Sequence, residues 1–284
     1  RLLQWHYHND GAVFGTPSLS GADAGVWKAW EKSCGNPDVI VAVIDQGVKC
    51  DHEDLADNMW INRGEIPGNG KDDDGNGYID DIHGYNFVDD MGQITASYER
   101  SHGTHVAGII AAVNNNGKGI SSIAGGTPDA PGVKIMSCQI FSGAYAGTVL
   151  EEVRAIKYAA DNGAVILQCS WGYTSGSANV YDWGEAGFAT EEEWIASSPI
   201  EKEALDYFIN NAGSPNGVID GGLAIFASGN EYAAQSSFPA AYSKCISVAA
   251  LAADYTPAIY TNYGAEVALS APGGDLEYYG TPGE

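Results

Sequence analysis

The chain carries the stretch Val-Ile-Val-Ala-Val-Ile-Asp-Gln-Gly at residues 39–47. Its first six residues are apolar and mostly β-branched, which predicts a strand buried on both faces of a sheet. The strand ends in Asp45. Open α/β folds bind their ligands at the carboxyl ends of parallel strands, so Asp45 is a candidate functional carboxylate. An aspartate at this point can equally form a turn or cap a helix, and the stretch alone leaves both interpretations open.

Runs of the same kind alternate along the chain with helical patterns. Further strands are predicted at 134–140, 165–169, 224–227, 245–249 and 267–269. Helices are predicted at 22–32, 102–114, 148–162 and 200–211. This alternation predicts an α/β fold of three layers, with a mostly parallel central sheet and helices on both faces.

The organisation of the chain suggests one domain. No internal repeat or shift in composition marks a second domain, so we expect one over residues 1–284. Two insertions stand out, an acidic one near 63–84 and a longer one at 173–222. We expect the longer insertion to be a loop with one helix. Its acids hint at basic substrates, although a solvated loop has the same composition.

The composition is that of an acidic, folded protein. The 284 residues include 13 Lys and Arg against 37 Asp and Glu, for a net charge of −24. Such an excess repels phosphate backbones, which argues against a nucleic-acid partner. No apolar run reaches the roughly 18 residues that a membrane span needs. Because the chain begins at Arg1 without an initiator methionine, we expect a removed leader and a secreted, extracellular or cell-surface protein.

A second motif, Ser-His-Gly-Thr-His-Val-Ala-Gly, occupies residues 101–108. A histidine at the start of a helix of small residues can turn its ring out of the helix end into a cleft, which makes His102 a candidate catalytic residue. His105 follows with the spacing His-x-x-His and no intervening glutamate, so the motif does not match a helical zinc peptidase. We expect His105 to be packed or hydrogen-bonded.

A third motif, Leu-Ala-Ile-Phe-Ala-Ser-Gly-Asn-Glu at residues 223–231, predicts a buried strand that ends in an amide side chain. Pointed into a cleft, Asn230 could donate its N–H groups to a developing oxyanion. The alternative is a turn asparagine in a left-handed conformation.

Together and in this order, the three motifs resemble the aspartate, histidine and oxyanion-asparagine segments of subtilisin-like serine proteases. Residues 167–172 resemble the family's substrate-binding strand, and residues 269–273 resemble its Ala-Pro-Gly turn. The resemblance covers nearly the whole chain and implies a subtilisin-like fold and a serine endopeptidase. It implies that Asp45 orients His102, that His102 takes and returns a serine proton, and that Asn230 binds the oxyanion.

The nucleophile is where the sequence departs from this family. The family's serine lies in a Gly-Thr-Ser-Met-Ala segment that opens a helix after the Ala-Pro-Gly turn, whereas here Gly280-Thr281 is followed by Pro282 and the residues end at Glu284. Three explanations stay open: the C-terminal part with the nucleophile helix lies beyond Glu284, it persists as a separate C-terminal fragment, or the protein is a non-catalytic peptide-binding or calcium-dependent interaction module. The preserved Asp45, His102 and Asn230 favour an enzyme whose serine lies beyond Glu284.

The acidic run at 72–81 suggests a calcium site. Oxygen ligands at alternate positions 72, 74 and 76, followed by a glycine and a carbonyl, match the first half of an EF-hand loop. The twelfth position is His83 rather than Glu, so Asp80 or Asp81 would have to close the site. The five aspartates of the run would repel one another without a cation, and similar subtilases carry such an insertion. The predicted Ca²⁺ ligands are Asp72, Asp74, Asn76, Tyr78 and Asp81.

The resemblance implies two further sets of contacts. Asp54 and Asn115 match residues that share a structural calcium in the family, although a helix C-terminal turn also favours asparagine and glycine. A polypeptide substrate would pair with backbone edges near 142–145 and 170–172. The predicted substrate-binding residues are Ser142, Gly143, Ser170, Trp171 and Gly172. Trp171 could shape the first pocket or belong to the core.

Overall fold

The computed structural model describes residues 4–13, 17–96, 101–143 and 147–275. The chain forms two compact units. The first unit comprises residues 33–169 and 198–224, and the second comprises residues 1–32, 170–197 and 225–284. The single domain expected over residues 1–284 stays a prediction.

Four parallel strands form the sheet of the first unit, in the order β2 (Gly84–Asn86), β5 (Lys134–Gln139), β1 (Ile40–Asp45) and β6 (Ala164–Cys169). All six residues of β1 are buried, as the apolar run predicts. Asp45 pairs with Gln139, so β1 and β5 end at the same level of the sheet. The predicted strand and the position of Asp45 at its carboxyl end are confirmed.

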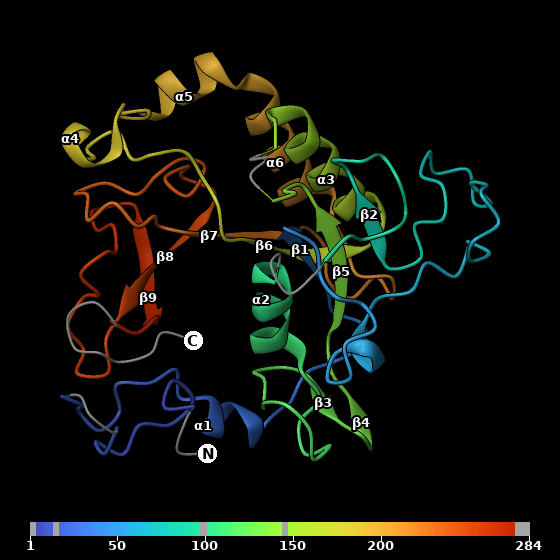
Figure 1. Cartoon of the computed structure of the whole chain (residues 1–284), viewed down its shortest axis with the longest axis horizontal. Coiled ribbons are helices and arrows are strands. Elements are labelled where there is room, and N and C mark those ends of the chain that lie inside the picture. Colours follow the sequence, from blue (N-terminus) through green and yellow to red (C-terminus); the bar gives the residue numbers. More distant parts are fainter. Residues whose placement is uncertain (1–3, 14–16, 97–100, 144–146, 276–284) are drawn as a thin grey trace. The chain divides into compact units, whose positions relative to one another are not determined.

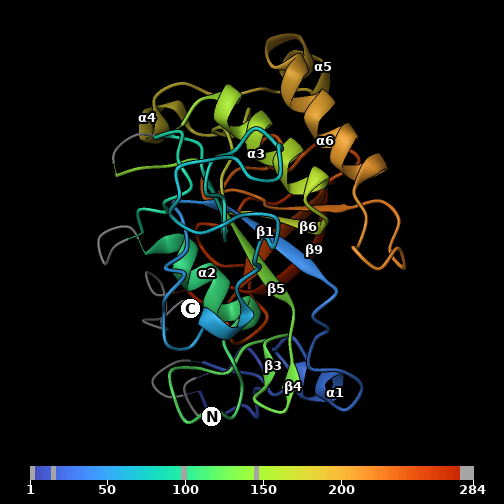
Figure 2. The same ribbon diagram turned by 90° about the vertical axis from the view of Figure 1, so that its right-hand side faces the viewer.

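Three helices cover this sheet, as the three-layer prediction requires. Figures 1 and 2 show α2 (His102–Ala111) on one side of the strands, and α3 (Val149–Asp161) and α6 (Pro199–Asn211) on the other. Val41 and Val43 of β1 belong to a buried cluster with Ala107 of α2. Small residues on α2 therefore let the helix lie close to the strands.

Several short elements of the first unit are not predicted from the sequence, because two or three residues are too few to show a helical or strand periodicity. They are the helix η1 (Ala56–Asn58), the three-residue strand β2, and an antiparallel pair formed by β3 (Gly126–Thr127) and β4 (Ala130–Pro131).

The second unit has parallel strands in the order β7 (Leu223–Ala227), β8 (Ile246–Leu251) and β9 (Val267–Pro272), with β7 beginning at the division between the units. Its helices are α1 (Val26–Trp30), α4 (Val180–Trp183) and α5 (Glu191–Ser197). The expected single helix in 173–222 is wrong, because this segment carries α4, α5 and α6. The acids of α5 suggest a solvated loop, but its Trp194 is fully buried and stacks on Phe238 with ring centroids 5.4 Å apart.

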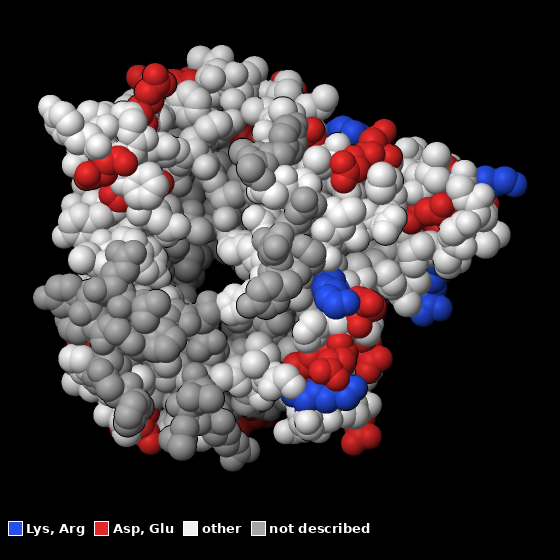
Figure 3. Space-filling view, viewed as in Figure 1, with Lys and Arg blue, Asp and Glu red and all other residues white. Residues whose placement is uncertain are grey.

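Acidic side chains dominate the charged surface. Figure 3 shows carboxylates spread over one face, with the fewer basic side chains beside them rather than gathered into a patch. No helix in the described part of the chain is both long enough and apolar enough to cross a bilayer.

Candidate active site and acidic cluster

Asp45 and His102 meet in the first unit. His102 is the first residue of α2, and its Nδ1 lies 2.8 Å from Oδ2 and 2.9 Å from Oδ1 of Asp45. The Asp45 side chain is 2% exposed, whereas that of His102 is 52% exposed. A carboxylate only accepts hydrogen bonds, so Nδ1 carries the proton and Nε2 of the neutral ring keeps its lone pair.

The start of α2 can approach the end of β1 because Gly103 has no side chain, and the loop after Asp45 also needs a glycine. A β-carbon on Gly103 would lie 2.6 Å from the carbonyl oxygen of Gly47 and 3.1 Å from Cβ of Asp45. Gly47 has φ of 92°, and a β-carbon there would lie 2.8 Å from Ile94. Thr104 adds a tie, since its hydroxyl accepts a 3.0 Å hydrogen bond from the backbone N–H of Lys49. The sequence motif therefore fixes the distance between the two ionisable groups.

The electrostatics of the pair favour an imidazolium. The hydrogen bond to Asp45 raises the pKa of His102 above its ordinary value of 6.5, against the opposing effect of burial. Asp45 also accepts a 2.6 Å hydrogen bond from the backbone N–H of Gln46, which helps to hold the carboxylate in place. The arrangement can accept a proton at Nε2 and stabilise the charge that results.

Backbone next to this pair carries two predicted substrate-binding residues. The carbonyl of Asp45 accepts hydrogen bonds from Ile140 (2.9 Å) and Phe141 (3.4 Å). Ser142 and Gly143 follow directly, half-buried and exposed respectively. Tyr145, at the end of the predicted edge, lies outside the described residues. Beside the loop after Asp45 there is an open cavity of about 810 Å³, whose lining includes Val48, Lys49, Asp80, His83, Met91 and Ile94.

The remaining predicted catalytic and substrate-binding residues belong to the second unit. Ser170, Trp171 and Gly172 follow β6, and the Trp171 ring packs edge-on against Phe226 of β7 with centroids 5.3 Å apart. Asn230 lies three residues after β7 and is exposed. In the first unit the structure thus brings Asp45 into contact with His102. In the second unit it brings Trp171 into contact with Phe226 of β7.

Four serines in the C-terminal part of the described chain are buried in the second unit. Ser228, Ser236, Ser237 and Ser247 are at most 3% exposed. The hydroxyl of Ser237 donates to the carbonyl of Ser228, and those of Ser236 and Ser247 are 2.9 Å apart. These four hydroxyls therefore serve the packing of the second unit.

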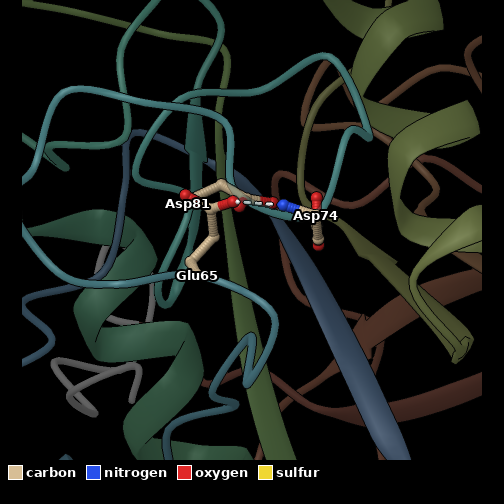
Figure 4. Close-up of side chains that lie close together, drawn as sticks. All are labelled: Glu65, Asp74 and Asp81. Carbon is tan, nitrogen blue, oxygen red and sulfur yellow. Dashed lines mark hydrogen bonds between the residues drawn. The ribbon is translucent and has the colours of Figure 1, made fainter.

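A cluster of three carboxylates lies in the acidic insertion of the first unit (Figure 4). One oxygen each of Glu65, Asp74 and Asp81 lies within 4.8 Å of the others. The amide of Asn62 donates 2.9 Å hydrogen bonds to both Asp74 and Asp81. Burial raises the pKa of Asp81, which also accepts a 2.6 Å hydrogen bond from Tyr158. The sequence motif points to Asp74 and Asp81 but misses Glu65, because a glycine-rich turn separates Glu65 from the acidic run.

The remaining residues predicted for this calcium loop have other contacts. Asp72 accepts hydrogen bonds from the backbone N–H groups of Gly75 (2.7 Å), Asn76 (3.1 Å) and Gly77 (2.9 Å), and the Gly77 bond does most to lower its pKa. Asn76 donates to Asp81 at 3.0 Å, so it borders the cluster. The backbone N–H of Tyr78 donates to Asn76 at 2.8 Å. Asp72 thus shapes the turn and is not part of the three-carboxylate cluster.

At the second predicted calcium position, the contact is shifted by one residue. The buried Asp54 accepts a 2.6 Å hydrogen bond from the amide of Asn116 and a 2.9 Å bond from the backbone of Ile120. Asn115 is instead exposed and has φ of 61°. Of the two asparagines, Asn116 thus contacts the Asp54 side chain, and the calcium predicted to be shared by Asp54 and Asn115 stays a prediction.

His105 also differs from expectation. It lies exposed on α2, three residues after His102, rather than packed.

Comparison with known proteins shows the family of the chain. Residues 36–283 match the subtilase family over most of the chain. The chain belongs to this family. The halolysin of Haloferax mediterranei is 32% identical over 245 residues, which is 86% of this chain and 37% of the halolysin. The halolysin-like extracellular serine protease Nep of Natrialba magadii is 30% identical over 249 residues, covering 87% of this chain and 36% of Nep.

A solved structure supports the fold. The serine protease of Aeromonas sobria superposes with a TM-score of 0.65 and 19% identity, over 96% of this chain and 42% of that protein. This subtilase chain spans just over a third of the length of the two halolysins.

Proposed function

We propose that the protein is a serine endopeptidase in which Asp45 and His102 activate a serine supplied by a segment beyond Glu284. The observation that carries the proposal is the contact between a buried carboxylate and Nδ1 of a half-exposed imidazole. This is the arrangement that makes the imidazole a base towards a hydroxyl, and family membership adds support.

In the proposed reaction, Nε2 of His102 takes the proton of the serine hydroxyl as its oxygen attacks the peptide carbonyl. Asp45 keeps the ring in the required tautomer and stabilises the imidazolium. Asn230 donates a hydrogen bond to the oxyanion of the tetrahedral intermediate. His102 then returns the proton to the leaving amine, and water hydrolyses the acyl-enzyme by the same steps in reverse.

The proposed substrate is an extended polypeptide. Exposed backbone at Gly143 and Gly172 offers edges for main-chain hydrogen bonds, and Trp171 beside β7 offers an apolar surface. We propose secretion as well, since one similar protein is named an extracellular protease.

We also propose that Glu65, Asp74 and Asp81 bind Ca²⁺. Three carboxylates within 4.8 Å, one of them fully buried, repel one another when ionised, and a cation between them would remove this repulsion. The carboxylates offer oxygen ligands, as calcium requires, and the amide N–H groups of Asn62 and Asn76 border the cluster. Asp54 with Asn115 is a second proposed calcium position, which the resemblance to the family implies.

The peptidase proposal is tested on the protein expressed from its complete reading frame. Wild type is expected to hydrolyse casein and to react covalently with a fluorophosphonate, and peptide mapping should locate the label on one serine. His102→Ala should abolish both, whereas His105→Ala, which changes the exposed histidine of the same helix, should retain both.

Failure of wild type to hydrolyse casein or take up the label would overturn the proposal. If a fluorescent peptide nevertheless bound with micromolar affinity, the protein would be a peptide-binding module of subtilase fold.

A further inference from the structure

A buried asparagine of the second unit holds the loop that carries Asn230. Asn262 is 0% exposed and lies between β8 and β9. Its backbone N–H donates a 3.0 Å hydrogen bond to the carbonyl of Gly229. Its Oδ1 accepts a 3.0 Å hydrogen bond from the backbone N–H of Glu231. These two groups belong to the peptide bonds on either side of Asn230, so Asn262 holds both.

The Asn262 side chain makes further hydrogen bonds to the same loop. Oδ1 also accepts a 2.9 Å bond from the backbone of Ala233. Nδ2 donates to the carbonyl of Ser228 at 3.0 Å and to the carboxylate of Glu231. Oδ1 and Nδ2 of Asn262 therefore make two hydrogen bonds each, and all four of these side-chain bonds go to residues 228–233. Aspartate and leucine have similar size but cannot make this set of bonds.

The backbone at this point is shaped around the amide. Gly229 has φ of 110°, and a β-carbon there would lie 2.2 Å from Nδ2 of Asn262. Within the described part of the chain no hydrogen bond to the Asn230 side chain is found, and that side chain is exposed. The direction of the Asn230 amide therefore depends on the backbone that carries it.

We infer that Asn262 is a positioning residue for the oxyanion donor Asn230. The inference rests on the proposed function, because it gives Asn262 its role through Asn230. A donor stabilises the transition state only when it is aimed, before the reaction, at the position where charge develops. By fixing both peptide bonds around Asn230, Asn262 keeps the donor aimed and removes the cost of ordering the loop in each turnover.

The test compares kinetics in two backgrounds of the full-length enzyme. Asn262→Ala should lower kcat by about 10- to 100-fold and change KM less than about threefold, since displacing a catalytic group by about 1 Å costs on that order. In an Asn230→Ala background the same substitution should lower kcat less than about threefold, because the donor is already gone.

Controls separate positioning from stability. Asn9→Asp changes another buried asparagine of the same unit, which bonds to Ala22 and Ala253, and should lower the melting temperature without changing kcat. If Asn262→Ala fails to fold, Asn262→Asp combined with Glu231→Gln reverses the donor and acceptor between these two side chains and should restore part of kcat over Asn262→Asp alone.

If Asn262→Ala lowered kcat equally in the wild-type and Asn230→Ala backgrounds, or in neither, the inference would be overturned. The proposed function would still stand as long as the wild type is active. An inactive wild type would instead overturn the proposed function.

Discussion

At the scale of single residues, the proposed chemistry depends on the different exposure of Asp45 and His102. The carboxylate is shielded from water and the imidazole is half-exposed, so the aspartate can orient the ring while Nε2 remains accessible. The carboxylate also favours the charged ring, which raises the pKa of His102.

Asp45→Asn is therefore expected to lower kcat/KM by about 10⁴-fold, because an amide can stabilise the wrong tautomer of His102. Wild-type kcat/KM should rise with pH as His102 loses its proton, with an apparent pKa above 6.5. In the variant this limb should move to lower pH, since the group that raises the pKa is neutralised. Peptide hydrolysis between pH 5 and pH 9 measures both effects. Asp57→Asn, at an exposed position, is the control and should change neither.

At the scale of elements, a second pair of ionisable groups joins two helices. Glu152 of α3 lies against the fully buried Glu201 of α6, and burial, followed by the charge of Glu201, raises the pKa of Glu152 to about 8. The folded state therefore binds a proton that the unfolded chain releases near its ordinary pKa of 4.5.

The free energy of unfolding should accordingly fall as pH rises from about 5 to about 8, by on the order of 1 to 3 kcal/mol. Glu152→Gln should remove most of this slope, because the glutamine supplies a permanent donor to Glu201. Denaturant unfolding at pH 5 and pH 8.5 measures the difference. Glu203→Gln on the exposed side of α6 is the matched control, and an equal slope in wild type and Glu152→Gln would contradict the prediction.

The acidic insertion gives a third prediction. Adding a calcium chelator should lower the melting temperature of wild type by several degrees, because the three carboxylates of the cluster lose the proposed cation. Asp74→Asn should abolish most of this sensitivity. Asp73→Asn should retain it, since the Asp73 carboxylate accepts bonds from Ile66 and Asn69 instead of joining the cluster. If the melting temperature of the wild type did not change when the chelator was added, the proposal of a stabilising calcium ion would be excluded.

The sequence predicts elements that have a period or a buried run, and misses those without one. The strand at 39–44 and the histidine helix are confirmed because apolar or small residues mark them over several turns or pleats. α5 is missed because its acids conceal Trp194, whose partner Phe238 is distant in sequence. Glu65 and the contact of Asn116 with Asp54 are missed for a related reason: which side chain reaches a distant carboxylate depends on turns such as that at Asn115, not on spacing alone.

At the scale of the whole molecule, the net charge of −24 gives the protein a negative electrostatic field. A cationic peptide should therefore reach the enzyme faster than an anionic one of the same length. We expect kcat/KM for a lysine-flanked peptide to exceed that for its glutamate-flanked counterpart by about 10-fold at low salt, and the ratio to fall as NaCl is added. A ratio that does not change with salt would assign the preference to a pocket rather than to the overall field.

The glycine that follows His102 has a consequence for variation in this sequence. Alanine is ordinarily the mildest replacement inside a helix. At position 103 it would press on the main-chain oxygen of Gly47 and force the first turn of α2 away from β1. We therefore expect Gly103→Ala to abolish the proposed activity although it changes none of the proposed catalytic side chains. Libraries of variants should keep glycine at this position.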